Sequence, residues 1–354
     1  MKKNSLIILV IILFLNVSNL AFSQEGGKYV YEFMNLSNSA RVTALGTNFL
    51  PTDDDDIDLV YANPSLISKE MNHQISLNYL DYFAGINAGF ISYGQDFNKV
   101  GTFVGSLQFI NYGTFDETDE TGQKVSEVIA SEYAFVIGWS KALSDKFRMG
   151  VNIKNIFSSL ASYSSYGIAA DVALTYSNRE RYFSTSLILK NMGRQITTYT
   201  DQYREPLPFQ IQMGIAKKFE HAPFRLLFLL NNLQTWDLKY NDPNAKGDID
   251  PFTGEKKEDS QAWAFADNAL RHAILGVEFV PGKGNFMVRL GYNYRRQQEM
   301  RIASRAAMVG FSFGFGMKVY KFKISYSRAS YHLAGGTNTI TIGTNFDNFF
   351  ATKE

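Results

Sequence analysis

The residues best suited to chemistry form an acidic run near the start of the chain. Asp53, Asp54, Asp55 and Asp56, followed by Asp58, place five carboxylates within six positions. Carboxylate oxygens are the ligands that Ca²⁺ prefers in proteins. The spacing is not that of an EF-hand loop, because no Gly follows at the required position and no Glu closes it. We therefore expect a solvated acidic turn rather than a metal site.

Catalytic motifs are not evident in the sequence. The histidines His73, His221, His272 and His332 are scattered and lack the His-Glu-x-x-His spacing of a zinc protease. A barrel hydrolase would need a serine, a histidine and an orienting group brought together by the fold. The glycines of Gly314-Phe315-Gly316 lie in a strand pattern, which indicates lumen-facing positions rather than a phosphate loop. We expect no enzyme activity, no catalytic residue, no metal and no cofactor.

The longest polar segment, residues 237–269, is the candidate binding loop. Loops longer than ~12–15 residues are usually functional or disordered, and both interpretations remain open here. Trp263 and Phe265 could anchor either a partner or the bilayer interface. The candidate partner-binding residues are Asp242, Asp248, Asp250, Trp263 and Phe265.

The elements that position these residues are predicted to be strands. From about residue 72 onward, apolar residues recur at every second position. In residues 147–157, Phe147, Val151 and Ile153 alternate with Arg148, Asn152 and Lys154. Only a strand separates residues in this way. Fourteen strands are predicted, near residues 72–80, 84–94, 100–112, 128–140, 146–158, 163–177, 181–191, 207–218, 223–236, 270–280, 284–296, 305–317, 320–330 and 337–346.

A transmembrane barrel explains this pattern better than a soluble β-sandwich does. The predicted strands often exceed ten residues, and a tilted membrane strand needs ~9–11. The long connections, 113–127, 192–206 and 237–269, all follow odd-numbered strands, as they must when long loops lie outside and short turns lie in the periplasm. The chain has 29 Phe and 20 Tyr, although its mean hydropathy is only −0.16. An apolar outer face around a polar, water-filled lumen accounts for both values.

The first 23 residues have the layout of a secretory signal peptide. Lys2 and Lys3 precede an apolar run, and Ala21-Phe22-Ser23 suits cleavage before Gln24. The alternative is an N-terminal membrane anchor, for which the apolar run is short. The predicted domains are then a signal peptide (1–23), a periplasmic or plug segment (24–71), the transmembrane β-barrel (72–346) and a tail (347–354).

Charge and cysteine content limit the possible partners. Cleavage would leave 33 basic and 34 acidic residues, so no basic block is available for nucleic acid. The chain has no cysteine, which excludes disulfides and thiolate metal sites.

The segment after the predicted cleavage site carries a recognisable motif. Its residues are Gly26, Gly27, Tyr31, Phe33, Asn35, Leu36, Ser39, Ala40, Arg41, Ala44, Leu45, Gly46, Asn63 and Pro64. Together they resemble the start of the PorQ family, outer-membrane barrels of the type IX secretion system of the Bacteroidetes. Asn-Pro followed by a small residue is shared with the wider group of barrels similar to FadL and PorV. Met34 and Thr47 depart from the family pattern, which has Leu and Gly there.

From the residues alone, Asn63-Pro64 indicates a turn or helix start, and Gly46 permits an unusual backbone angle. Arg41 could pair with an acid inside the lumen, and we expect the segment to plug or brace the barrel. The resemblance implies a place in the attachment complex, where the barrel anchors a surface protein resembling PorZ alongside PorU and PorV. That complex processes cargo and joins it to lipopolysaccharide. The alternative function is a FadL-like transporter of small hydrophobic molecules. In either case the chain would sit in the outer membrane of a Gram-negative bacterium and contact its lipid.

Overall fold

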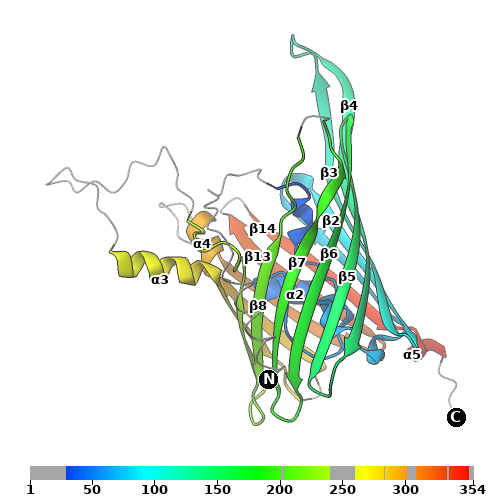
Figure 1. Cartoon of the computed structure of the whole chain (residues 1–354), viewed down its shortest axis with the longest axis vertical. Coiled ribbons are helices and arrows are strands. Elements are labelled where there is room, and N and C mark those ends of the chain that lie inside the picture. Colours follow the sequence, from blue (N-terminus) through cyan, green and yellow to red (C-terminus); the bar gives the residue numbers. More distant parts are fainter. Residues whose placement is uncertain are drawn as a thin grey trace, which may run out of the picture.

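The computed structural model describes residues 29–200, 203–239, 260–282, 284–300, 308–332 and 335–350. Fourteen antiparallel strands close into one barrel, in which β1 pairs with both β2 and β14 (Figure 1). The strands are β1 Gln74–Asp81, β2 Asn87–Phe97, β3 Gly101–Thr118, β4 Lys124–Ala142, β5 Phe147–Leu160, β6 Tyr163–Asn178, β7 Phe183–Thr197, β8 Gln210–Lys218, β9 Phe224–Leu230, β10 Ala273–Phe279, β11 Phe286–Asn293, β12 Phe311–Val319, β13 Phe322–His332 and β14 Gly335–Asn345. The predicted fold class and strand count are therefore confirmed.

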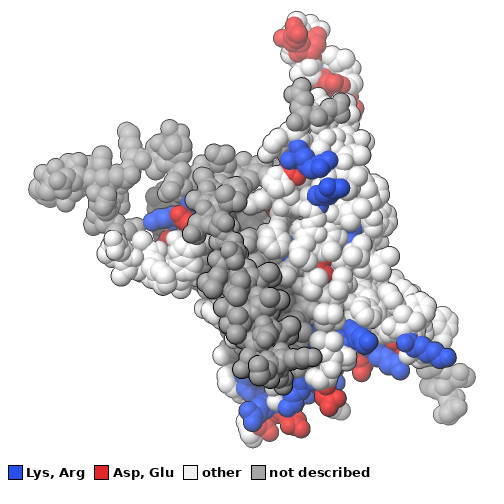
Figure 2. Space-filling view, viewed as in Figure 1, with Lys and Arg blue, Asp and Glu red and all other residues white. Residues whose placement is uncertain are grey.

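The outside of the barrel is apolar. On β5, Ile153 and Phe157 are 47% and 45% exposed, whereas their neighbours Asn152 and Lys154 are buried. The same alternation runs along β12, where Phe311, Phe313 and Phe315 face outward. Figure 2 shows a broad, mainly uncharged band above the charged lower end of the barrel. An apolar belt around a closed barrel is the form in which β-strands cross a membrane.

The connections differ between the two ends of the barrel. The links after even-numbered strands are short, and the longest of them, residues 280–285, joins β10 to β11. None of these links carries a helix in the described residues. The links after β7, β9 and β11 are long, and the last two contain α3 (Gln261–His272) and α4 (Tyr294–Met300). We call the end with the long links the outer end, following the usual arrangement of such barrels.

The structure corrects several predicted boundaries. Residues 113–127, expected to be a long loop, mostly extend β3 and β4 into a hairpin that projects beyond the barrel (Figure 1). Residues with a high strand propensity, such as Thr114, Phe115 and Val125, favour this extension. Asp119 closes the turn by accepting backbone hydrogen bonds from Thr121 and Gln123. In the opposite direction, β9 ends at Leu230, and β11 ends at Asn293 before α4.

A plug formed by residues 29–71 lies inside the barrel. It comprises η1 (Glu32–Asn35), α2 (Ala40–Ala44), η2 (Ile57–Leu59), η3 (Pro64–Leu66) and η4 (Lys69–Met71). Its apolar side chains, such as Leu45 and Phe49, share a hydrophobic core with inward-facing strand residues such as Ile188 and Leu229. The expectation of a water-filled lumen at this level is therefore wrong, because the inner polar residues pack against the plug.

Two further helical turns complete the described chain. A 3-10 turn, η5 (Phe83–Gly85), connects β1 to β2, and a short helix, α5 (Asp347–Phe350), follows β14. No helix in the described part of the chain is long and apolar enough to cross a membrane.

Candidate functional site

The plug rests directly on strand backbone at glycines that face inward. A Cβ atom built on Gly150 of β5 would lie 2.2 Å from the carbonyl carbon of Pro64. A Cβ on Gly291 of β11 would lie 2.2 Å from the carbonyl carbon of Leu45. Only glycine permits so close an approach between backbones. The Asn63-Pro64 and Leu45-Gly46 parts of the motif are thus seated on opposite parts of the barrel wall.

Hydrogen bonds attach the plug to strands around the barrel. Ala40 donates its backbone N–H to Thr341 of β14 at 2.8 Å. Asn152 of β5 donates to the carbonyl oxygen of Tyr61 at 2.9 Å, and Asn63 donates to Ser186 of β7 at 3.1 Å. Because these bonds reach separate strands, the plug is fixed to the wall along much of its circumference.

A buried cluster of charges joins the plug to β9, β10 and β11. Arg41 binds Asp54, Asp56 and Glu278 at 2.7, 2.8 and 2.9 Å. Arg225 of β9 also binds Asp54 and Glu278, at 3.0 and 2.6 Å. Burial works to raise the pKa of Asp54, but Arg41 and Arg225 together hold it below its usual value. Arg41 therefore pairs with acids inside the lumen, as expected from the sequence.

The acidic run is not the solvated turn that we expected. Asp53 lies 3.4 Å from both Arg148 and Arg179, and Ser68 donates to Asp55 at 2.7 Å. Each of these aspartates is at least partly buried and has a partner. Among the described residues, no group of three or more acidic or histidine side chains is arranged to hold a metal ion. The run braces the plug against the barrel.

Asp58 lies at the periplasmic end of the plug, and no basic side chain in the described part of the chain forms an ion pair with it. Its carboxylate accepts hydrogen bonds from Ser76 and Asn78 of β1, at 2.6 and 2.8 Å. Burial, together with the nearby charge of Asp56, raises the pKa of Asp58 to about 7. Asp58 therefore makes the seat of the plug sensitive to pH near neutrality.

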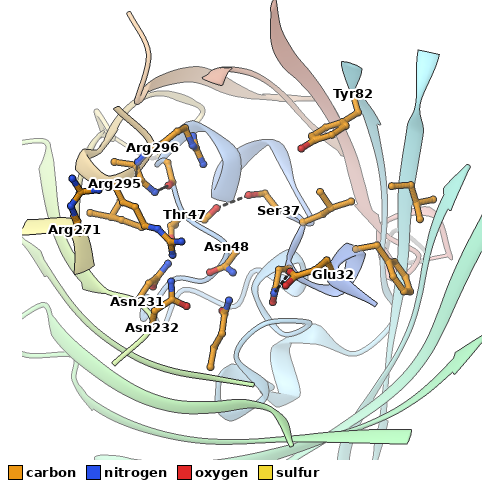
Figure 3. Close-up of a pocket in the computed structure, with 18 of the residues that line it drawn as sticks. Glu32, Ser37, Thr47, Asn48, Tyr82, Asn231, Asn232, Arg271, Arg295 and Arg296 are labelled. Carbon is orange, nitrogen blue, oxygen red and sulfur yellow. Dashed lines mark hydrogen bonds between the residues drawn. The ribbon is translucent and has the colours of Figure 1, made fainter. Parts of the chain in front are cut away.

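A cavity of about 440 Å³, which we call the outer vestibule, opens above the plug at the outer end. Figure 3 shows Arg271, Arg295 and Arg296 on one side of it and Glu32 and Tyr82 on the other. The arginines come from the end of α3 and from α4. The remaining lining residues are Phe33, Asn35, Leu36, Ser37, Gly46, Thr47, Asn48, Ile110, Tyr112, Gln210, Asn231, Asn232, Ile274 and Asn293.

Ion pairs and hydrogen bonds fix the polar lining of the outer vestibule. Arg271 binds Asp267 at 2.8 Å one turn earlier on α3, and Arg295 binds Glu299 at 2.7 Å one turn later on α4. At the floor, Ser37 donates to the carbonyl oxygen of Thr47 at 2.5 Å (Figure 3). The cavity is thus lined by side chains that are held in place by the surrounding structure.

The motif residues that the structure describes all belong to the plug. Gly26 and Gly27 lie outside the described residues. Tyr31 bonds Ser165 of β6 at 2.5 Å, Phe33 is buried, and Asn35 and Leu36 line the outer vestibule. Ser39 caps α2 at the backbone N–H of Val42, and Ala44 packs beside Gly314 of β12. The sequence motif is therefore largely a set of contacts between plug and barrel.

The predicted binding loop is described only in part. Asp242, Asp248 and Asp250 lie outside the described residues. Trp263 and Phe265 lie on α3 and are 53% and 63% exposed. Phe265 packs against Trp236, with ring centroids 5.0 Å apart. Neither aromatic residue lines the outer vestibule, although Arg271 near the end of the same helix does.

Sequence reasoning missed most of the outer vestibule. The sequence pattern predicts Arg295 and Arg296 at the end of a strand over 284–296, and Tyr82 in a short link between strands. The one available signal was the run of polar residues from Tyr294 to Glu299, which interrupts the alternation. Asn231 and Asn232 also end an apolar run, but neither pattern reveals that these segments meet over the plug.

Comparison with known proteins gives structural matches alone. No protein-family model matches the chain, and no curated protein matches it. Similar solved structures include a deletion mutant of TodX, a monoaromatic hydrocarbon channel (TM-score 0.49, 10% identity, covering 88% of this chain and 100% of that chain). Another is the CymD monoaromatic hydrocarbon channel (TM-score 0.47, 12% identity, covering 87% of this chain and 97% of that chain). A third is a Pseudomonas aeruginosa FadL homologue (TM-score 0.44, 11% identity, covering 88% of this chain and 98% of that chain).

The closed ring of fourteen strands and its apolar belt decide where the chain resides. It is an outer-membrane β-barrel of a Gram-negative bacterium. Transmembrane barrels of this kind, with short turns at one end and longer links at the other, are outer-membrane proteins.

Proposed function

We propose that this barrel is a membrane anchor of the PorQ type, which holds a surface protein of the type IX secretion attachment complex. The observation that carries the proposal is the plug. It is seated on strand backbone at Gly150 and Gly291 and bound through the buried Arg41 cluster. A barrel filled and fixed in this way is suited to holding a position in the membrane.

The outer end supplies a surface for the partner. Residues 114–129, which we call the acidic ribbon, form strand pairs with each other, because β2 pairs with β3 as far as Asn111 and β5 pairs with β4 as far as Ala130. Where the ribbon leaves the barrel, Ala161 donates its backbone N–H to the carbonyl oxygen of Ile129 at 3.3 Å. The ribbon contains five acidic residues and one lysine, and its acids gather at the tip in Figure 2. Exposed Phe115, Val125 and Ile129 add apolar area.

These properties favour a partner that offers a basic strand. Unpaired strand edges accept a further strand by backbone hydrogen bonding, and the charge of the ribbon would repel a second copy of itself. In the proposed complex the partner is a surface protein resembling PorZ, with PorU and PorV nearby. The barrel itself makes and breaks no bonds.

The experiment is deletion of the whole barrel, followed by comparison of the proteins in the medium and in the outer membrane. Loss of the anchor should release the surface partner into the medium while export across the membrane continues. Expression of the intact chain in the deletion strain should restore attachment of the surface partner to the outer membrane.

If deletion releases no surface protein, the anchoring function is wrong. The alternative, transport of small hydrophobic molecules, would then be tested by uptake. It requires the plug to move, because the plug lies between the outer vestibule and a second cavity of about 430 Å³ at the periplasmic end. Uptake lost on deletion, without release of protein, would favour the transporter.

A further inference from the structure

The chemistry of the outer vestibule has no role in the anchoring function. Six of its lining side chains are amides, and three are guanidinium groups. Amides donate and accept hydrogen bonds at the same time, so they match hydroxyl groups, which do the same. The amide residues are Asn35, Asn48, Gln210, Asn231, Asn232 and Asn293.

The guanidinium groups lie together on one side of the cavity (Figure 3). Asp267 and Glu299, which lie behind the lining, bind Arg271 and Arg295 through Nε. Among the described residues, Glu32 is the one acidic residue of the lining itself. Burial raises the pKa of Glu32 above its usual value. Planar guanidinium groups bind carboxylate and phosphate groups through paired hydrogen bonds. This side of the outer vestibule is therefore suited to an anion.

The opposite side provides flat apolar area. Tyr82 lies there (Figure 3), and Tyr112, Phe33 and Ile110, which belong to the same hydrophobic cluster, also line the cavity. Aromatic rings offer a large apolar face, and tyrosine adds a hydroxyl that can hydrogen-bond. The C–H face of a sugar ring can pack on such a surface while its hydroxyl groups reach the amides.

We propose that the outer vestibule binds an anionic saccharide, with its carboxylate or phosphate on Arg271 and Arg296 and a sugar ring against Tyr82. The volume of about 440 Å³ lies within the range of small-ligand clefts. A purely hydrophobic ligand fits this lining poorly, because it would cover polar amide and guanidinium groups without offering them hydrogen bonds in place of water.

The test is calorimetric titration of the purified full-length barrel in lauryldimethylamine oxide, a detergent without a sugar headgroup. The probes are cellobiouronate, cellobiose 6′-phosphate and neutral cellobiose, which share one disaccharide frame. At least one anionic disaccharide should bind roughly tenfold or more tightly than cellobiose, as expected for hydrogen bonds to a charged group. Comparing the two anions distinguishes a carboxylate site from a phosphate site.

Variants locate the site. Arg271→Gln and, separately, Arg296→Gln should remove the preference for the anion, and Tyr82→Ser should weaken all three disaccharides. Arg194→Gln is the matched control, because Arg194 is exposed near the outer end of β7 and does not line the outer vestibule. It should bind as the intact chain does.

Three results would overturn the proposal: equal binding of charged and neutral disaccharides, an equal loss in Arg194→Gln, or preferential binding of dodecanoate that the disaccharides do not displace. The last of these would support a hydrophobic ligand instead. The titration uses the purified barrel alone, so its outcome is separate from that of the deletion experiment on anchoring.

Discussion

At the scale of single residues, Gly150 tests whether the plug depends on contact between backbones. Gly150→Ala adds a Cβ 2.2 Å from the carbonyl carbon of Pro64. Overpacking of this kind typically costs ~1–3 kcal/mol, so the barrel should lose its heat-resistant mobility on unboiled gels at a lower temperature. Gly105→Ala is the control, because nothing lies within 4 Å of a Cβ there. Loss of this mobility at the same temperature in both variants would show that the backbones of Gly150 and Pro64 are not in close contact.

Asp58 makes a second prediction at this scale. Its pKa of about 7 in the folded protein lies above the unfolded value of 3.8. The folded state thus favours the protonated carboxyl, and the stability from Asp58 is fully present below pH 3.8 and lost as the pH rises through 7. The midpoint temperature of heat unfolding should decrease as the pH is raised from 5 to 8, and Asp58→Asn should make that decrease smaller. If Asp58→Asn leaves the pH dependence unchanged, then that dependence arises from other titratable groups.

At the scale of elements, alternation could be predicted because each strand has an apolar and a polar face. What fills the lumen could not be predicted from this alternation. The sequence shows that Asn152 faces inward, and a water-filled lumen would make Asn152→Arg mild. The structure reverses this expectation, because Asn152 is buried and donates to Tyr61 of the plug. A period of two identifies the side of the strand but not what lies against it.

A pair of substitutions on β5 separates the two sides. Ile153→Arg places a charge toward lipid and should cost ~2–4 kcal/mol near the midplane, so less folded barrel should reach the membrane. Asn152→Arg should instead dislodge the plug and expose it to protease in barrels that still fold. Ile153→Leu is the control for β5 and should be close to neutral. Protection of the plug in Asn152→Arg would argue against the contact with Tyr61.

At the scale of the whole molecule, the strand number and the end of the barrel that carries the long links follow from the sequence, since both depend on local pattern. The outer vestibule does not, because it combines the plug with Tyr82, Asn231 and Arg296, which are distant along the chain. The acidic ribbon was also missed. Its residues were assigned to a loop, since acidic residues and the turn at Asp119 obscure the alternation that Phe115 and Val128 continue.

The position of the ribbon changes where the partner is expected to dock. The ribbon is the part of the described barrel that extends farthest beyond the outer end in Figure 1, and its strand edges are unpaired. Replacing residues 114–128 by a short Gly-Ser turn should leave the barrel folded, because the pairs from Asn111 and Ala130 inward are retained and surface segments tolerate changes in length. The shortened barrel should release the surface partner, measured by the proteins in the medium. Replacing residues 241–259, which belong to the binding loop predicted from the sequence, is the matched comparison. Release by that replacement alone would move the docking surface to the segment before α3, and release by neither would place it elsewhere on the outer end.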